Sequence, residues 1–342
     1  MKLGDLEFHI LVDGKVHLDG GAMFGVVPRT LWEKVKPPDD RNRIRMATNC
    51  LLAARGEELV LVDTGIGDKH DPRFRDTFGM DPAAVRLPDA IRRAGYAIEQ
   101  VTHVVLTHLH FDHCGWNTRR ASQGPQTAAA PSDELVPTFP NAVYWLERSE
   151  VEHARRPNER DRASYDPRNW EPLFAAGVAR LFDGEPGCEP IPGVRAVRAA
   201  GHNADMCIVL LDGGRAGAGE PGEFGGKAVF FADLVPTVAH VAYPWIMSYD
   251  LFPMTTLENK KAWLPWAAAG EWLAIFQHEA EMPLGRVVEE KPGRFRAVPL
   301  GPLAPLAQVA AGPDREGTAA DPRRLPRPAD TDPADAAVPP VP

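Results

Sequence analysis

The beginning of the chain alternates between short apolar runs and turn residues, a pattern typical of β-structure. Residues 5–17 alternate in polarity and predict an edge strand, or a hairpin that turns at Asp13-Gly14. Two further strands are predicted over Thr48–Ala54 and Glu58–Val62, joined by a turn at Arg55-Gly56-Glu57. We expect these segments to be strands of a sheet.

The segment Gly20–Pro28 is rich in glycine and apolar residues, so it is expected to be a loop laid over another part of the molecule. Its Met23 and Phe24 could line a substrate pocket or simply pack. Other segments carry helix signals or close a hairpin. They are Pro88–Ala94 with Gly95 as its stop, Glu147–Arg156, a helix capped by Thr255 or Thr256 that runs to about Ala269 before Gly270, and the hairpin Arg286–Val298.

Four apolar strands are each followed closely by a histidine or an aspartate. Loops at one edge of a sheet scaffold commonly deliver the groups of a single site, so we expect these side chains to meet. The strands and the residues that follow them are Val104–Leu106 before His108, Val194–Val197 before His202, Ala228–Phe231 before Asp233, and Trp272–Phe276 before His278.

The first of these strands leads into a dense group of ligand-type side chains, His108, His110, Asp112 and His113. Imidazole and carboxylate groups suit divalent zinc, iron or manganese. Alternate residues of an extended backbone point the same way, so His108 and His110 can share one ion while Asp112 and His113 turn toward a neighbouring position. The alternative is a polar loop that happens to hold three histidines. The density of ligand types favours a metal site.

Two residues near this loop have supporting roles in the prediction. Asp63 ends the strand Glu58–Val62 and could orient a ligand histidine, or could be a plain turn aspartate. Cys114 adjoins the metal loop and is expected to be a small packing residue rather than a ligand.

The composition is that of a globular protein, with 44% hydrophobic and 25% charged residues in a chain of 342. The formal net charge of −9 argues against a nucleic-acid surface. We expect no signal peptide and no membrane span, and the four scattered cysteines suit a reducing cytoplasm. Residues 1–295 are expected to form the folded domain, and the Pro/Ala-rich residues 296–342 a disordered tail.

The least regular part of the predicted domain is residues 116–180, which resemble a lid or insertion. Within it, Arg160, Asp161 and Arg162 are expected to form a solvated salt-bridge cluster. The Gly-rich segment Gly213–Gly226 lacks the GK[ST] ending of a phosphate-binding loop and is expected to be a flexible hairpin loop.

The order His-x-His-x-Asp-His, a distant Gly-His, an Asp and a His resembles the metallo-β-lactamase-fold hydrolase superfamily over about residues 5–295. The resemblance implies an α/β fold, an αββα sandwich with a dinuclear metal site along one edge of its sheets. It further implies one ion on His108, His110 and His202, and a second on Asp112, His113 and His278. Asp233 would bridge the two ions, and Asp63 in the sequence VDTG would match the aspartate that orients a ligand.

Within the superfamily, HLHFDHCGWN most resembles the branch of the N-acyl-homoserine lactonases and methyl-parathion-type phosphotriesterases. The chain departs from the lactonases at two places. GHNADM replaces the frequent GHTPGH, and Pro236 stands where they carry a substrate-contacting tyrosine. Tyr243, Tyr249 or His240 could take the place of that tyrosine.

The resemblance implies a metal-dependent hydrolase whose two divalent ions, expected to be zinc with manganese, iron or cobalt as alternatives, share a hydroxide that attacks a small lactone or carboxylic ester. Asp112 or Asp233 could shuttle the proton to the leaving group. Phosphotriester hydrolysis is the enzymatic alternative, and a non-catalytic metal-binding sensor or scaffold is the alternative of another class. The resemblance also suggests a homodimer. The expected pocket walls are Met23, Phe24, Trp116, His240 and Tyr249.

Overall fold

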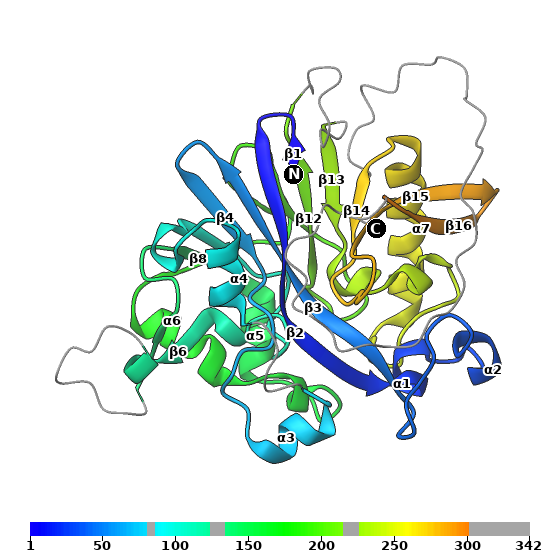
Figure 1. Ribbon diagram of the computed structural model, residues 1–342, viewed down its shortest axis with the longest axis horizontal. Helices are drawn as coiled ribbons and strands as arrows, with labels where there is room; N and C mark the ends of the chain where they lie inside the picture. Colours follow the sequence, from blue (N-terminus) through cyan, green and yellow to red (C-terminus); the bar gives the residue numbers. More distant parts are fainter. Residues whose placement is uncertain (81–85, 124–133, 215–225, 301–342) are drawn as a thin grey trace.

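The computed structural model describes residues 1–80, 86–123, 134–214 and 226–300. Two seven-stranded sheets form the centre of the molecule, with helices on both outer sides (Figure 1). The first sheet has the order β1-β2-β3-β4-β5-β8-β9 and the second runs β10 to β16 in chain order. A short pair, β6 (Thr118–Arg120) and β7 (Leu135–Pro137), stands apart from both sheets.

The two sheets differ slightly in how their strands pair. In the first, β1 to β4 are antiparallel, whereas β4, β5, β8 and β9 run parallel. In the second, only the β13–β14 pair is parallel. The strands of the first sheet are β1 (Lys2–Leu3), β2 (Leu6–Asp19), β3 (Arg43–Arg55), β4 (Glu58–Val62), β5 (His103–Val105), β8 (Val143–Glu147) and β9 (Ala179–Phe182). Those of the second are β10 (Cys188–Ile191), β11 (Val194–Arg198), β12 (Cys207–Asp212), β13 (Lys227–Phe230), β14 (Leu273–Ile275), β15 (Leu284–Lys291) and β16 (Arg294–Pro299).

The main core lies between the sheets, where apolar side chains such as Phe8, Val62, Val209 and Phe230 are fully buried together. A second core fills the space between the first sheet and its helices. This four-layer arrangement confirms the predicted α/β sandwich. The helices are α1 (Gly20–Phe24), α2 (Arg29–Trp32), α3 (Pro72–Thr77), α4 (Leu87–Arg93), α5 (Arg148–Arg155), α6 (Glu171–Ala175) and α7 (Pro253–Ala269).

Several local predictions were wrong, and each has a physical reason. Asp13-Gly14 does not turn a hairpin. It forms a bulge inside the continuous strand β2, where the register with β3 shifts between Val12 and Lys15. Gly20–Phe24 is a short helix rather than a loop, because the Asp19 side chain accepts the Ala22 N–H and starts a turn. The long helix begins earlier than predicted, at Pro253, whose fixed φ suits a first helical position.

The bulge in β2 turns the Asp13 carboxylate inward, where it is 5% exposed. It accepts the backbone N–H groups of Ile66, Gly67 and Leu87 and the indole N–H of Trp116. Asp13 therefore joins the loop after β4, the start of α4 and the segment after the metal loop. No helix of the described residues is long and apolar enough to cross a membrane.

The predicted disordered tail begins at residue 296, but residues 296–299 lie in strand β16, paired with β15. From residue 301 onward the tail lies outside the described residues, as does most of the predicted Gly213–Gly226 loop. Arg160, Asp161 and Arg162 were expected to form a solvated salt-bridge cluster, and for Asp161 this prediction was wrong. Asp161 is 5% exposed and its carboxylate lies 2.6 Å from His153 Nε2, because this segment folds back onto α5.

Candidate metal centre

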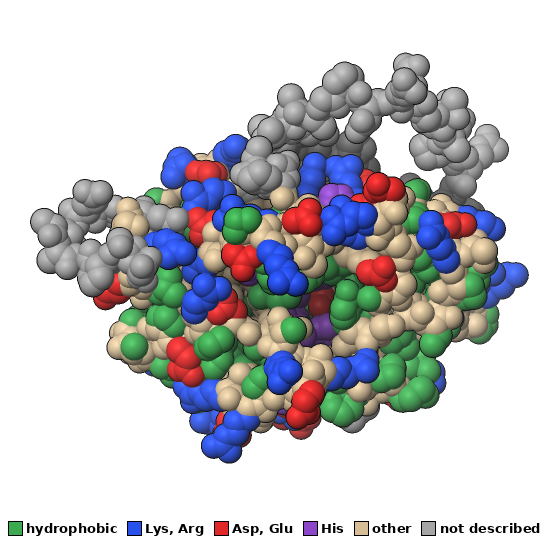
Figure 2. Space-filling view, turned by 90° about the horizontal axis from the view of Figure 1, so that it is seen from below, with side chains coloured by type: hydrophobic (Ala, Val, Ile, Leu, Met, Phe, Trp, Pro, Cys, Tyr) green, Lys and Arg blue, Asp and Glu red, His purple; other side chains and the backbone are tan. Residues whose placement is uncertain are grey.

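All seven predicted ligands converge at one end of the two sheets. Histidine and acidic side chains lie in a hollow on this face of the molecule, bordered by hydrophobic side chains (Figure 2). Each predicted ligand lies just after the end of a strand. Four of them follow β5, and His202, Asp233 and His278 follow β11, β13 and β14 respectively. Three overlapping groups have ligand atoms within 4.8 Å of one another. They are His108, His110 and His202; His108, His113 and Asp233; and Asp112, His113 and His278.

Asp233 occupies the centre of this cluster. Its Oδ2 atom lies 3.2 Å from Nε2 of His202 and 3.5 Å from Nε2 of His113, and its Oδ1 atom lies 3.0 Å from Nε2 of His278. The preceding Ala232 has φ +46°, a left-handed conformation that non-glycine residues adopt at a cost. One carboxylate thus faces imidazoles of both outer ligand groups.

The imidazoles themselves are packed unusually closely. His202 Nε2 lies 3.0 Å from His110 Nδ1, and His278 Nε2 lies 3.3 Å from His113 Nε2. The buried Nε2 atoms of His108 and His110 have no hydrogen-bond partner. Buried polar atoms are normally satisfied, so these nitrogens and close contacts fit a site that is completed by cations.

Three of the histidines have a hydrogen-bond partner at Nδ1, the ring nitrogen that faces away from the centre of the site. His113 Nδ1 lies 3.0 Å from Asp63 Oδ2, and His278 Nδ1 lies 2.9 Å from the Ala47 carbonyl oxygen. His202 Nδ1 lies 3.0 Å from Asp250 Oδ1. Such contacts fix the tautomer and direct the Nε2 atom toward the centre of the site.

Asp63 is itself firmly placed, since it is fully buried and accepts both the backbone N–H and the hydroxyl of Thr107. Asp250 was missed by the sequence analysis. It lies in an irregular segment before α7, with no strand end or motif to mark it, and only the fold brings it to His202.

The electrostatics of the cluster separate its histidines into two sets. Burial, reinforced by neighbouring histidines, holds the pKa values of His108 and His110 well below the usual range. Burial, the largest single cause, also opposes protonation of His113, His202 and His278, but the surrounding carboxylates together outweigh it and raise their pKa values. Asp233 acts on all three, with Asp112 at His113 and His278, Asp63 at His113 and Asp250 at His202.

The same imidazoles act on Asp233 in return. Burial disfavours its charged form, yet His113, His278 and His202 hold its pKa well below the usual value. An ionised carboxylate surrounded by imidazole nitrogens is the donor set that divalent zinc, manganese, iron or cobalt accepts.

The residues expected to line a pocket lie in different surroundings. Met23, Phe24, Trp116 and His240 are each at most 2% exposed. His240 stacks on Phe24 and its Nε2 atom bonds the Met23 carbonyl oxygen, so its ring is used in packing. These four side chains therefore have almost no surface exposed in this structure, and their role as pocket walls stays a prediction.

Tyr249 is different, because 40% of it is exposed. Burial of its hydroxyl, with the Asp19 and Asp112 carboxylates, raises the pKa of Tyr249 to about 12. The other two residues proposed to replace the substrate-contacting tyrosine of the lactonases are not exposed in the way that Tyr249 is. His240 is buried, and Tyr243 packs its ring against Phe295 of β16.

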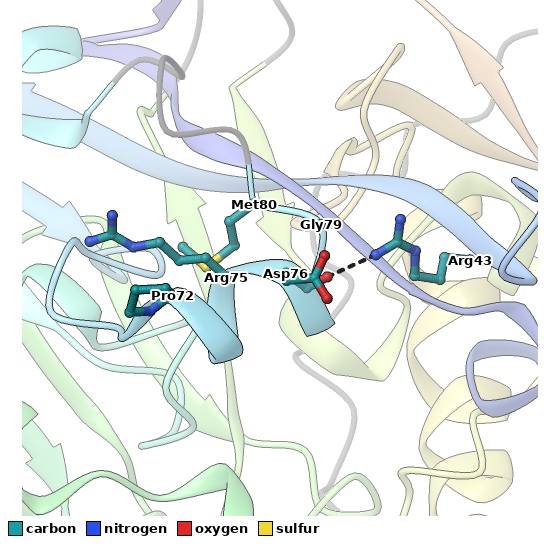
Figure 3. A pocket seen from close by; sticks show the side chains of 6 residues that line it. All are labelled: Arg43, Pro72, Arg75, Asp76, Gly79 and Met80. Carbon is teal, nitrogen blue, oxygen red and sulfur yellow. Dashed lines mark hydrogen bonds between the residues drawn. The ribbon is translucent and has the colours of Figure 1, made fainter.

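A separate depression of about 450 Å³ lies beside α3 (Figure 3). Its lining contains none of the predicted site residues, and Arg43 crosses it to donate a hydrogen bond to the Asp76 carbonyl oxygen at 3.0 Å. It is distinct from the hollow above the histidine cluster.

The sequence has relatives among known hydrolases. Residues 43–206 match the metallo-beta-lactamase superfamily. A probable metallo-hydrolase of Mycobacterium tuberculosis is 30% identical over 219 residues, which make up 56% of this chain and 63% of that protein. An N-acyl homoserine lactonase of Bacillus cereus is 23% identical over 186 residues, or 52% of this chain and 62% of the lactonase. The chain thus spans less than two thirds of these curated relatives.

Solved structures share the fold over more of the chain. A probable metal-dependent hydrolase from Staphylococcus aureus superposes with a TM-score of 0.74 at 26% identity, covering 89% of this chain and all of the other. AidC, a dizinc quorum-quenching lactonase in complex with a product, superposes with a TM-score of 0.66 at 21% identity, covering 89% and 97%. The chain thus contains a stretch, residues 43–206, that matches the metallo-β-lactamase superfamily, and the proteins to which it is similar include metallo-hydrolases and N-acyl homoserine lactonases.

Proposed function

We propose that the protein is a dinuclear metal-dependent hydrolase of small ester-like substrates, with lactones as the first class to test. The observation that carries the proposal is the position of Asp233. Its Oδ2 atom faces His202 of one ligand group and His113 of the other, and its Oδ1 atom faces His278 of that second group. A carboxylate so placed can contact two ions at once.

The ligand sets follow from the groups of close donor atoms. His108, His110 and His202 would hold one ion, and Asp112, His113 and His278 the other, with Asp233 shared. When bound, divalent ions supply Lewis acidity toward a carbonyl or phosphoryl oxygen and lower the pKa of water. Zinc is the first choice, and the dizinc lactonase with the same fold supports it.

The chain's own groups would handle the substrate and its protons. Tyr249 is half-exposed and within electrostatic reach of Asp112, and with a pKa of about 12 its hydroxyl stays protonated at neutral pH. It can therefore donate a hydrogen bond or a proton toward a leaving oxygen. Asp112, whose side chain is 13% exposed, can accept a proton.

Lactones are the substrate class we propose first. A protein similar in sequence is an N-acyl homoserine lactonase, and a solved structure with the same fold is a quorum-quenching lactonase. Phosphotriester hydrolysis is the enzymatic alternative, and Pro236 leaves it open because the lactonases carry a tyrosine at that position. The Pro236 carbonyl oxygen accepts the His278 N–H at 2.8 Å, so a residue at this position lies next to the cluster.

Three further expectations remain part of the proposal. Residues 1–295 would act as one hydrolase domain, and the protein would work in the cytoplasm, which its four free, buried cysteines support. A homodimer is also proposed, by resemblance alone.

The test is a hydrolysis panel run with the metal-loaded protein. It contains N-acyl-homoserine lactones, simple lactones, aryl esters, paraoxon-type phosphotriesters and glutathione thioesters. The proposal expects lactone or ester turnover that chelation abolishes and added metal restores. Turnover of phosphotriesters alone would select the alternative, and bound metal without turnover of any substrate would favour the sensor or scaffold.

A further inference from the structure

Glu150, on α5, is a buried carboxylate that neither the ligand set nor the proposed chemistry uses. It is 1% exposed, yet its partners are all neutral donors. Oε1 accepts the Leu109 N–H at 2.8 Å and the Tyr165 hydroxyl at 3.2 Å, and Oε2 accepts the Asn203 side-chain N–H at 2.9 Å. Within the described parts of the chain it forms no ion pair. A buried carboxylate without a cation is costly, because the charge loses its hydration and gains no opposite charge.

The three partners of Glu150 all adjoin one ligand group. Leu109 lies between His108 and His110 in the chain, and Asn203 follows His202. These two loops belong to different sheets, since His108 and His110 follow β5 and His202 follows β11. Each oxygen of Glu150 therefore holds one loop, and the carboxylate spans the distance between them.

Tyr165 completes the contact with this half of the centre. Its hydroxyl donates to Glu150, its backbone forms a β-bridge with His110, and the two rings meet edge to face with centroids 4.9 Å apart. At Tyr165, the segment that was predicted to be a lid therefore contacts and supports the predicted ligand His110.

Asn203 also explains one departure of the sequence from its relatives. Its Oδ1 atom accepts the N–H groups of Asp205 and Met206 at 3.0 and 2.6 Å, which leaves its NH₂ group directed at Glu150. The amide orientation is therefore fixed by the turn. A carboxylate oxygen, which only accepts, is the complementary partner.

We propose that Glu150 is a positioning residue that sets the spacing between the His108–His110 loop and the His202 loop, and thereby the affinity of that half of the centre for its ion. This inference rests on the proposed dinuclear centre. It concerns the ion held by His108, His110 and His202, and leaves the ion held by Asp112, His113 and His278 unaffected.

The test is a titration of the chelated protein with Co²⁺, followed by its visible absorption, together with the stoichiometry of bound metal. Glu150→Gln keeps the shape but replaces one acceptor oxygen by an NH₂ group, so either the Leu109 or the Asn203 contact is lost. We expect one of two Co²⁺ ions to bind about 10–100-fold more weakly, the range typical of residues that support a ligand. Glu152→Gln, on the same helix and exposed, is the matched control and should bind both ions as the wild type does.

A rescue variant separates positioning from general destabilisation. Combining Glu150→Gln with Asn203→Asp reverses the direction of the hydrogen bond, because the new carboxylate can accept from the new amide while its other oxygen keeps the turn. The inference predicts that the weakened Co²⁺ site recovers in the double variant. Urea unfolding of each metal-free variant checks that it is folded.

Three results would overturn the inference. One is a Glu150→Gln variant that binds both ions as tightly as the wild type. Another is an equal loss of affinity at both ions without rescue, which would indicate a merely structural role. If the wild type itself binds less than one ion, the proposed dinuclear function fails first, and this inference fails with it.

Discussion

Asp250 Oδ1 lies 3.0 Å from His202 Nδ1, and Asp250 Oδ2 accepts the Thr256 hydroxyl at 2.8 Å. These two contacts, from Thr256 to Asp250 and from Asp250 to His202, fix the orientation of the His202 ring, so that its Nε2 atom points to the centre of the cluster. Because Thr256 lies in α7 and Asp250 in the loop before it, the helix on the outer side of the second sheet supports a ligand of the proposed metal centre.

Replacing Asp250 should therefore weaken metal binding without removing a ligand. We expect Asp250→Ala to lower the affinity for the ion at His202 by about 10–100-fold. Thr256→Val, which removes only the supporting hydroxyl, should have a smaller effect in the same direction. Competition with a chromophoric chelator measures both. Unchanged affinity in Asp250→Ala would show that the contact does not orient His202.

Asp63 should matter for stability even before metal is bound. Asp63→Ala leaves the Thr107 N–H and hydroxyl and His113 Nδ1 without their buried acceptor. At 1–3 kcal/mol for an unsatisfied buried group, we expect a loss of about 3 kcal/mol in the free energy of unfolding. Urea unfolding of the chelated protein measures it, with the exposed Asp5→Ala as control. A loss no larger than that of the control contradicts the prediction.

Asp13 should give the protein a pH-dependent stability. Burial outweighs its four hydrogen bonds and raises its pKa to about 6. The unfolded carboxyl titrates near 3.9, so the folded state binds the proton more tightly and stability must fall as pH rises between these values. At 1.36 kcal/mol for each unit, the fall is about 3 kcal/mol, complete slightly above pH 6.

Asp13→Asn removes this titration, although its amide is a poorer partner for four donors and should lower stability at every pH. The measurement is urea unfolding of both chelated proteins from pH 4 to pH 7, in which the shared histidine contributions cancel in the difference. The wild type should lose its advantage progressively across that range. A difference that stays constant, or grows with pH, would refute the assignment.

Tyr249→Phe tests the proposed proton donor. If the hydroxyl assists the leaving oxygen, the variant should lose about 10²-fold in kcat, at the lower end of what general acid catalysis contributes. Metal content should stay the same, because Tyr249 belongs to none of the ligand groups. Tyr243→Phe, whose ring packs on Phe295 away from the cluster, should keep full activity. Equal rates for the two variants would exclude Tyr249 from the reaction.

The convergence of the predicted ligands could be foreseen because it depends on local signals. His108, His202, Asp233 and His278 each follow an apolar run of residues. Such a run predicts a strand, and the residue after it is then expected at the edge of the sheet where that strand ends. The α/β sandwich was predicted from the family resemblance. Asp63 was found in the same way, as the carboxylate at the end of β4.

The supporting residues could not be foreseen, since their partners are distant in the chain. Asp250 lies in an irregular segment before α7, and Glu150 lies in the first turn of the short helix α5, where a carboxylate is ordinarily solvated. Asp13 was predicted to be a turn residue because Asp-Gly is a common hairpin turn sequence, whereas no comparable sequence pattern marks a bulge. Phe24 and His240 are candidate pocket residues in sequence, but their mutual stacking depends on a contact 216 positions apart along the chain, between α1 and the segment after β13.

The central claim is that Asp233 is shared by two ions in a hydrolytic centre. The most direct measurement is the metal content of the wild type and of Asp233→Asn after loading with zinc, taken with lactone hydrolysis by the same samples. The account predicts about two ions for each wild-type chain, and for Asp233→Asn weakened binding with loss of turnover. Two tightly held ions and full turnover in Asp233→Asn, or less than one ion in the metal-replete wild type, would contradict it.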